Sequence, residues 1–478
     1  MAVLVPDLLY RDDVFYSGLA VEYDEITGRI TRIAHSLELD SRDAVPLPGR
    51  ALMPGFVNAH SHAFQRLIRG RTQWRPADET VANFWSWREA MYSAALRLSP
   101  EDIYDVSRYC FIEMLRAGIT TVGEFHYLHN APDGKPYGDR AELARRVIGA
   151  AQDAGIRICL LNTCYAAGGI DEPLGPEQRR FDTGTLDTYL ATTERLAADV
   201  VGQPRVSVGV APHSVRAVPR DWLPTLHAWA ATRDLPLHMH VSEQPAEVEA
   251  CVAAFGRRPI EMLDEAGVLD ERFTGVHATH ITDREVVMLA ISGGTVCACP
   301  TTERDLGDGF LRGGDLLRAG AGIALGTDSQ TMLDMFEEAR LVEYNERLRR
   351  LERVLLTRGA DDVLEVAPTL LRMATSAGAR SLRVPAGTLE PGALADFTGI
   401  DLEHPTLAGW NARSLPAMLA FSAPPDVVSD VWVGGRNVVA NRGHVKQEVA
   451  MREFNAIARR TAVGSGAGAG GGASATGR

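Results

Sequence analysis

Residues 53–62 read MPGFVNAHSH, an apolar run that starts with a Pro-Gly pair and ends with two histidines one residue apart. A Pro-Gly pair starts a strand more readily than it continues a helix. In a strand, residues i and i+2 point to the same side, so the imidazoles of His60 and His62 would converge on one point. The pattern favours a metal site at a strand end over two packed core histidines.

Apolar runs of the same kind recur along the chain, each followed by a helical stretch, as is typical of parallel βα units. Two of them, VSVGVAPHS (206–214) and GIALGTDSQ (322–330), are continuously apolar and turn polar at their C-terminal ends. Strands buried on both faces of a barrel show this pattern. The sequence therefore predicts an α/β protein with a (β/α)8 barrel and functional groups at the carboxyl ends of its strands. The eight expected strands are 51–60, 119–127, 157–165, 205–213, 236–243, 274–281, 295–300 and 322–328.

The chain is acidic: 62 acidic and 49 basic residues give a net charge of −13, and no basic block accumulates. This argues against nucleic acid or an anionic membrane surface as partner. No segment reaches the roughly 20 apolar residues that span a bilayer, and MAVLVPDLLYRDD at the start lacks the pattern of a signal peptide. We therefore expect a cytoplasmic protein. Its six cysteines form neither a disulfide framework nor a four-cysteine zinc pattern, so we expect reduced, mostly buried thiols.

Histidines and carboxylates gather at the ends of the expected strands. In such a barrel these ends approach one another although they lie far apart in the sequence. Three imidazoles and one carboxylate, with an open position for water, suit Zn²⁺ acting as a Lewis acid. A single strand-end histidine is more often a hydrogen-bonding residue than a ligand, but the joint pattern predicts a metal centre. The strand-end residues are His60, His62, Glu124, Tyr127, His213, His238, His240, Glu243, His277, His280 and Asp328.

The segments PGFVNAHSH, HMHVSE, VHATH and GTDS occur in the order and at the separations seen in the amidohydrolase superfamily, which the chain resembles. HSHAFQRLIRGRTQ, FWSWREAMY, GEFHYLHN and APHSVRAV further resemble its branch of formimidoylglutamate deiminases. The resemblance covers all but the C-terminal tail. It implies hydrolytic deamination of N-formimino-L-glutamate to N-formyl-L-glutamate and ammonia, in histidine degradation, by a homodimer.

The resemblance also implies a distorted (β/α)8 barrel beside a small β-sandwich built from both chain ends. The sequence agrees, because both ends carry short strand-like pieces such as RITRIAHSLEL and SDVWVGGRNVV. We expect residues 1–50 and 386–455 to form the sandwich and residues 51–385 the metal-dependent barrel. Residues 456–478, rich in Gly, Ala and Ser towards their end, are expected to form a flexible tail.

Matched motif by motif, the resemblance implies one metal ion, zinc with iron as the alternative, because no lysine ends the fourth expected strand to bridge a second ion. Glu243 matches a glutamate that moves protons between water and substrate. His277 matches the histidine of the sixth strand, for which His280 is an alternative, and His238 is expected to be a packed core residue. The implied ligands are His60, His62, His240 and Asp328, and the implied catalytic residues are Glu243, His277 and Asp328.

Formiminoglutamate carries two carboxylates, which require cations in a protein of net charge −13. Arginine suits this role because its planar fork binds a carboxylate through two parallel hydrogen bonds. By resemblance, Arg88 and Arg216 bind the carboxylates, while Gln65, Tyr127 and His213 add polar contacts. Taken alone, either arginine would be interpreted as a solvated surface residue.

Two other functions fit parts of the sequence. Another deaminase of the superfamily, acting on a nucleobase, nucleoside or triazine, would use the same ligands and could stack its substrate on Phe84, Trp85 or Trp87. Such residues more often pack a helix against the core. A non-catalytic barrel scaffold is the second alternative, but the ligand and proton-handling positions all hold competent residues.

Overall fold

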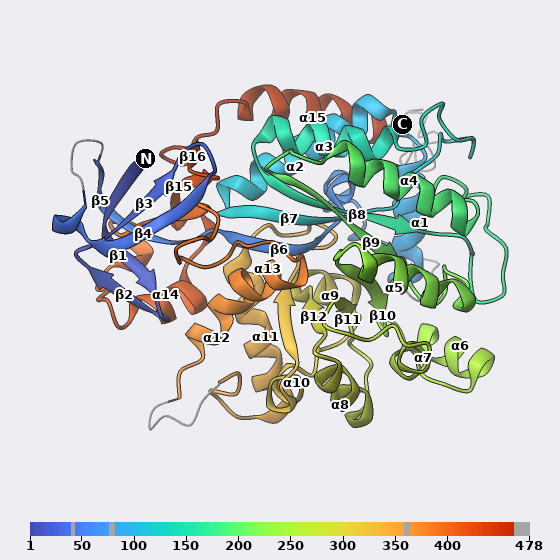
Figure 1. The fold of residues 1–478 in the computed structure, drawn as a ribbon. Helices are drawn as coiled ribbons and strands as arrows, with labels where there is room; N and C mark the ends of the chain where they lie inside the picture. The colour runs from blue at the N-terminus through green and yellow to red at the C-terminus, as the bar shows by residue number, and fades with distance from the viewer. Residues whose placement is uncertain (40–43, 76–81, 358–363, 463–478) are drawn as a thin grey trace, which may run out of the picture.

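A sheet of eight parallel strands forms the centre of the computed structural model, which describes residues 1–39, 44–75, 82–357 and 364–462 (Figure 1). The strands follow one another in chain order, and the sheet closes where its last and first strands end. There the peptide N–H groups of Thr327 and Asp328 donate to the carbonyl of His60, and that of His62 donates to the carbonyl of Asp328. The predicted (β/α)8 barrel is confirmed. Its strands are β6 (Phe56–Ser61), β7 (Ile119–His126), β8 (Arg157–Cys164), β9 (Val206–Pro212), β10 (Leu237–Val241), β11 (Phe273–His277), β12 (Thr295–Ala298) and β13 (Gly322–Leu325).

Helices cover the outside of the barrel, and local sequence sets where they begin and end. Before the helix that starts at Pro100, Ser99 and Asp102 exchange side-chain-to-backbone hydrogen bonds in a capping box. The helix that follows β7 ends at Gly155, whose φ of 92° suits a residue without a side chain. The helices up to the end of the barrel are α1 (Phe84–Ala95), α2 (Pro100–Arg116), α3 (Glu142–Ala154), α4 (Leu186–Asp199), α5 (Leu223–Thr232), α6 (Pro245–Phe255), α7 (Pro259–Glu265), α8 (Asp283–Ser292), α9 (Pro300–Leu306), α10 (Gly313–Ala319), α11 (Met335–Arg350), α12 (Ala367–Arg372) and α13 (Gly378–Ser381).

The two chain ends share a second, mixed sheet, in the place where a small β-sandwich from both ends was predicted. Its order is β16-β15-β14-β5-β1-β3-β4, with β2 paired to β1. The N-terminal and C-terminal parts join where β5 pairs antiparallel with β14. Figure 1 shows this sheet beside one end of the barrel. Its elements are β1 (Ala2–Arg11), β2 (Val14–Ser17), β3 (Leu19–Asp24), β4 (Arg29–His35), β5 (Ala44–Pro54), β14 (Phe397–Asp401), α14 (Leu415–Ser422), β15 (Val428–Val433) and β16 (Arg436–Val439).

The boundary between the two sheets lies at Gly55 and not at residue 51. The apolar run predicted as one strand over 51–60 is divided, because residues 51–54 complete β5 and β6 starts at Phe56. A Cβ at Gly55 would lie only 2.2 Å from the Thr120 hydroxyl oxygen, so glycine is needed for the chain to pass from one sheet to the other. The Pro54-Gly55 pair marks this division in the sequence, but the apolar, buried residues on both sides of it resemble one continuous strand.

A further correction concerns the C-terminus. The tail predicted from residue 456 begins inside α15 (Gln447–Ala462), which packs against α2. The rings of Phe454 and Tyr109 stack with centroids 4.4 Å apart, and Arg108 pairs with Glu453. This contact holds the helix through Ala462. Residues 463–478 lie outside the part of the chain that the structure describes.

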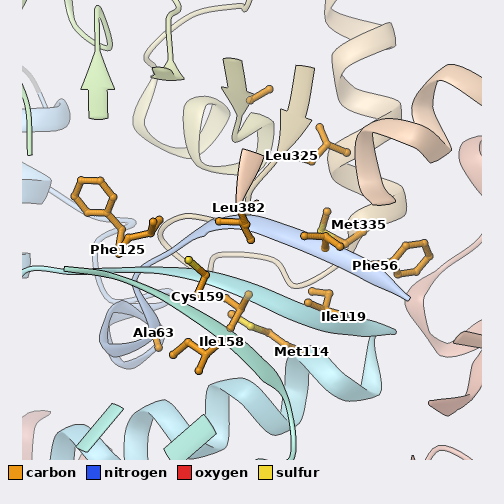
Figure 2. Packing of buried hydrophobic residues seen from close by; sticks show 14 of the residues in the cluster. Phe56, Ala63, Met114, Ile119, Phe125, Ile158, Cys159, Leu325, Met335 and Leu382 are labelled. Atoms are coloured by element: carbon orange, nitrogen blue, oxygen red, sulfur yellow. The ribbon is translucent and has the colours of Figure 1, made fainter. Parts of the chain in front are cut away.

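Buried apolar side chains fill the space around β6, β7 and β8 (Figure 2). On one side of β6, Phe56 meets Phe336 edge-on, with ring centroids 5.0 Å apart. On the other side, Met114 of α2 belongs to the same cluster as Ile119 and Ile158. All residues of these three strands are buried, and the polar residues among them gather mainly towards their carboxyl ends, at the barrel mouth.

An ion pair connects the barrel to the small sheet. Both carboxylate oxygens of Asp396 accept hydrogen bonds of 3.0 Å from the guanidinium of Arg157 on β8. The same carboxylate accepts the N–H of Gly434, and Arg157 also donates to the carbonyl of Pro204. Because these buried charges are paired and hydrogen-bonded, they fix the geometry of the junction.

Other predictions can be checked on the same structure. All six cysteines are buried and free. Among the described residues, no helix is both long enough and apolar enough to cross a membrane.

Candidate active site

Four side chains meet at the carboxyl end of the barrel, on β6, on β10 and just beyond β13. The Nε2 atom of His60 lies 3.1 Å from the Nε2 atoms of both His62 and His240. The Asp328 Oδ1 atom lies 3.3 Å from the Nε2 atom of His60 and 3.2 Å from that of His62. Ligands about 2.0–2.1 Å from a tetrahedral ion would be separated by roughly 3.3 Å. The structure thus brings the four predicted ligands together at a spacing that fits one metal ion.

Hydrogen bonds of the imidazoles provide a second test of this fit. The Nδ1 atom of His62 faces the carbonyl of Phe125 at 2.8 Å, and that of His240 faces the carbonyl of His213 at 3.0 Å. Since a carbonyl only accepts, both Nδ1 atoms carry the proton and both Nε2 atoms present lone pairs. A proton on the Nε2 atom of His60 could be donated to only one of these two lone pairs. A cation bound among the three Nε2 atoms would interact with all of their lone pairs.

Electrostatics at this cluster favour neutral imidazoles at His60 and His240 and an ionised carboxylate at Asp328. Burial lowers the pKa of His60 to about 3. Burial alone would raise the pKa of Asp328, but hydrogen bonds with His60 and His62 outweigh it and hold that pKa well below its usual range. Metal ligands need these protonation states.

The backbone is strained where the ligands are held. Ser242, His277, Ala278, Asp328 and Gln330 all have positive φ, between 44° and 71°. Each lies just beyond, or at the end of, β10, β11 or β13. Non-glycine residues adopt this conformation at a cost, and they cluster at functional sites. The strained turns re-aim the side chains at the barrel mouth.

A buried polar network holds the backbone of Asp328 in place. The Gln330 amide donates to the carbonyl of Asp328 at 2.7 Å and to the hydroxyl of Ser61 at 2.9 Å, and its oxygen accepts from Thr327 at 2.7 Å. Ser61 in turn donates to Glu124, which also accepts the N–H of Ala63. The network connects the turn after β13 to the His60–His62 segment, so it fixes the ligands relative to one another.

We expect Gln330→Ala to weaken the affinity for bound metal about 10- to 100-fold, because side chains that orient ligands typically contribute this much. Competition with a chelator of known affinity measures the change. Gln152→Ala, on the exposed face of α3, is the matched control. Equal metal affinity in parent and Gln330→Ala would show that the network does not position Asp328.

Glu243 and His277 lie beside the four-residue cluster. The His277 Nε2 atom is 3.6 Å from the Glu243 carboxylate and 3.7 Å from Oδ2 of Asp328. Its Nδ1 atom lies 3.3 Å from Glu303. Burial raises the pKa of Glu243 to about 6, although the charges of His277 and Arg216 oppose the shift. A carboxyl group with a pKa near neutrality can both accept and donate a proton.

The other two strand-end histidines point elsewhere. The turn at His277 and Ala278 ends β11, so His280 no longer lies on the strand. Its Nε2 atom donates to the carbonyl of Asp308 at 2.7 Å. His238 lies deeper in the barrel and donates to the carbonyl of Ser381 at 2.9 Å. Of the two histidines in HATH, the structure therefore places only His277 against Glu243 and Asp328.

A pocket opens above the cluster. All five predicted substrate-binding residues line it, together with Glu243 and residues of α1. The amide of Gln65 donates to the Tyr127 hydroxyl at 2.7 Å, while its oxygen is buried without a partner among the described residues. Arg88 stacks on the Trp85 ring at 4.4 Å, and its Nε atom is likewise unpartnered. The predicted five are Gln65, Arg88, Tyr127, His213 and Arg216.

Arg216 lines this pocket and lies close to Glu243. Its Nε atom lies 3.3 Å from the buried carboxylate of Glu247, and its Nη2 atom lies 4.0 Å from Glu243. Glu247 also accepts the N–H of Ser242 at 2.9 Å. The guanidinium is therefore held from behind by Glu247 while it lines the pocket.

Several residues of the site were not predicted from the sequence. They are Glu247 behind Arg216, Glu303 and Asp308 near His277, and the aromatic residues Tyr92, Tyr165 and Phe181 in the pocket wall. Tyr92 ends the segment FWSWREAMY and Tyr165 ends the expected strand 157–165, so both had a signal in the sequence. Glu247, four residues after Glu243, had a weaker one as a second acid beside HMHVSE.

Comparisons with known proteins agree with this geometry. The profile of the amidohydrolase family matches residues 51–438. A formimidoylglutamate deiminase from Pseudomonas aeruginosa is 40% identical over 407 residues, which cover 85% of this chain and 88% of that protein. A 5-methylthioadenosine/S-adenosylhomocysteine deaminase from Natronomonas pharaonis is 30% identical over 468 residues, 96% of this chain and 97% of that protein.

Among solved structures, an adenosine deaminase from Xanthomonas campestris with bound zinc matches with a TM-score of 0.81 and 26% identity, covering 97% of this chain and 98% of that one. The barrel, the strand-end cluster and these matches lead to one conclusion. The chain belongs to the amidohydrolase family. It is a hydrolase of the deaminase type.

Proposed function

We propose that the protein hydrolyses N-formimino-L-glutamate to N-formyl-L-glutamate and ammonia. The observation that carries the proposal is the pairing of two arginines, Arg88 and Arg216, with the histidine–aspartate cluster in one pocket. A small dianion with a hydrolysable amidine needs both. The 40% identity to a formimidoylglutamate deiminase supports the same substrate.

His60, His62, His240 and Asp328 would hold one divalent cation, zinc in the first instance and iron as the alternative, since both accept imidazole and carboxylate ligands. When bound, such a cation lowers the pKa of a coordinated water from about 15.7 towards about 7. The zinc in the structure of the Xanthomonas campestris adenosine deaminase supports zinc here.

The chain's own residues then handle the protons. Asp328 accepts a proton from the attacking water, and His277, 3.7 Å from Asp328, orients that water. Attack of the water oxygen on the formimino carbon forms a C–O bond and turns the C=N bond into a single bond. Both protons of the water are passed to the terminal nitrogen, by way of Asp328 and Glu243; the C–N bond then breaks as the C=O bond of the formyl group forms, and ammonia leaves. The pKa of Glu243, raised to about 6 by burial, suits this transfer at neutral pH.

Arg216 and Arg88 bind the two carboxylates of the substrate. Arg216 lies nearer the chemistry, 4.0 Å from Glu243, whereas Arg88 projects from α1. Gln65, Tyr127 and His213 add polar contacts, and the unpartnered oxygen of Gln65 offers an acceptor. Bidentate pairing with arginine provides both charge and geometry.

Deamination of a nucleoside is the second candidate, favoured by the aromatic pocket wall and by the nucleoside deaminases among the relatives. The wall offers few free ring faces, however. Phe181 meets the rings of Tyr92, Tyr127 and Tyr165 at centroid distances of 5.2–5.4 Å, and the rings of Phe84 and Trp87 lie against each other with centroids 6.1 Å apart. These contacts favour the dicarboxylate.

The proposed reaction belongs to histidine degradation, for which we propose a cytoplasmic homodimer. Two measurements test the proposal at its base. Elemental analysis should find about one zinc per chain, whereas a metal-free native protein would favour a non-catalytic scaffold. Ammonia release should be faster with formiminoglutamate than with formiminoglycine, which lacks the side-chain carboxylate, and equal rates would contradict the dicarboxylate site.

A further inference from the structure

One face of α1 forms a wall of the pocket. Its residues Phe84, Trp87, Arg88, Met91 and Tyr92 line the pocket, and they follow the i, i+3, i+4, i+7, i+8 pattern of a single helix face. Arg88 can therefore meet a substrate only while α1 keeps its position and rotation against the barrel.

Few contacts hold α1 in this position. Of its 12 residues, those that are buried are Phe84, Met91, Tyr92 and Ala95. A helix of this length is marginal on its own in water, so its position depends on the rest of the protein. The backbone carbonyls at its C-terminal end lack helical partners and require donors from elsewhere.

Arg180 provides donors at this end of α1. Its side chain, in the loop between β8 and α4, is 0% exposed. The Nη1 atom donates to the carbonyl of Ala95, the last residue of α1, and the Nη2 atom donates to that of Leu98 at 2.6 Å. Burial lowers the pKa of this guanidinium. The negative end of the helix dipole offsets part of the cost of burying the cation.

Neighbours of Arg180 contact the same half of α1. The Gln178 amide donates to the Tyr92 hydroxyl at 3.4 Å, and the rings of Phe181 and Tyr92 have centroids 5.3 Å apart. The backbone carbonyl of Arg180 accepts the N–H of His129, just beyond β7, at 3.0 Å. The segment 178–181 is thus tied to the barrel on one side and to α1 on the other.

We propose that Arg180 is a positioning residue for substrate binding, which holds α1 so that Arg88 faces the substrate. Arg180 is not among the described residues that line the pocket, so it acts through the helix. The role of Arg88 rests on the proposed function, whereas the position of α1 matters for any substrate of this pocket. The metal cluster and Glu243 lie on other segments and do not depend on Arg180.

Arg180→Met keeps the apolar stem and removes the donors. It should raise KM about 10- to 100-fold on whichever amidine or nucleoside the parent hydrolyses, and change kcat by less than about threefold. Its zinc content should equal that of the parent. Arg179→Met is the matched control, because Arg179 is exposed and donates to the carbonyl of Pro132. Arg180→Lys should lie between parent and Arg180→Met, and it replaces Arg180→Met if that variant does not fold.

Hydrogen exchange measured by mass spectrometry tests the position of α1 without any substrate. In Arg180→Met, the amides of residues 84–98 should exchange at least about tenfold faster than in the parent, while those of β6 and β8 stay protected. A general loss of stability would instead speed exchange in the helix and in the strands alike.

A double-mutant cycle connects Arg180 to Arg88. Where Arg88→Met lowers kcat/KM, the loss in the double variant should be at least about threefold smaller than the product of the two single losses. Losses that multiply, an unchanged KM, unchanged exchange in α1, or the same effects in Arg179→Met would overturn the inference. An Arg88→Met protein as active as the parent on formiminoglutamate would contradict the proposed function instead, and KM and exchange in Arg180→Met would still decide the role of Arg180.

Discussion

Glu243→Gln should retain about one zinc ion per chain and lose about 10²- to 10⁴-fold in kcat, the usual contribution of a positioned general acid–base group. The amide has the shape of the carboxylate but cannot carry the proton to the leaving nitrogen. Glu243 lies outside the four-residue cluster, so the metal site should stay intact. Metal content and steady-state turnover, measured on the same preparation, separate the two effects.

Glu249→Gln is the matched control, since Glu249 is exposed six residues further along the chain, on α6. It should behave like the parent in both measurements. A nearly fully active Glu243→Gln would rule out the proton-transfer role. A Glu243→Gln protein without bound metal would instead place Glu243 among the ligands.

Arg216→Met should lower kcat/KM for formiminoglutamate, with a loss of transition-state stabilisation of about 2–5 kcal/mol, because a desolvated substrate carboxylate loses its partner. Part of the loss will come from the protein, since the buried Glu247 also loses the cation 3.3 Å away. Arg216→Lys should recover only part of the activity, because a point charge cannot reproduce the planar fork.

Formiminoglycine separates substrate binding from damage to the pocket. Suppose that Arg88 and Arg216 each hold one carboxylate. The variant that lacks the partner of the side-chain carboxylate should then have nearly the same kcat/KM for formiminoglycine as the parent, because this substrate has no side-chain carboxylate. Arg220→Met serves as the control, because Arg220 is exposed and pairs with Glu265. Arginine variants that treat both substrates as the parent does would contradict the assignment.

The barrel and the metal cluster could be predicted from the sequence because both depend on local patterns. Buried parallel strands are continuously apolar, and each ends in polar residues at the same edge of the barrel. His60 and His62 share a strand face by spacing alone. His240 and Asp328 were two of several candidates at strand ends, and the resemblance to the amidohydrolase superfamily selected them as ligands.

What the sequence did not predict depends on contacts between distant segments. The Pro54-Gly55 pair does not by itself show that one strand ends and another begins, because buried residues continue on both sides, and only the approach of Thr120 shows why glycine is required there. Asp308 reaches Glu243 through a loop whose path no motif encodes. The helical residues 456–462 are ordered by α2, a partner more than 300 positions earlier in the chain.

Ammonia release by the zinc-loaded protein tests the central claim most directly, with formiminoglutamate compared at equal concentration with 5-methylthioadenosine, adenosine, guanine and cytosine. A pocket built to pair two carboxylates should favour formiminoglutamate by at least about 10²-fold in kcat/KM, because neutral substrates offer no carboxylate to the partly buried Arg88 and Arg216. A higher kcat/KM for any of the nucleosides or bases would contradict the account and assign the pocket to that substrate.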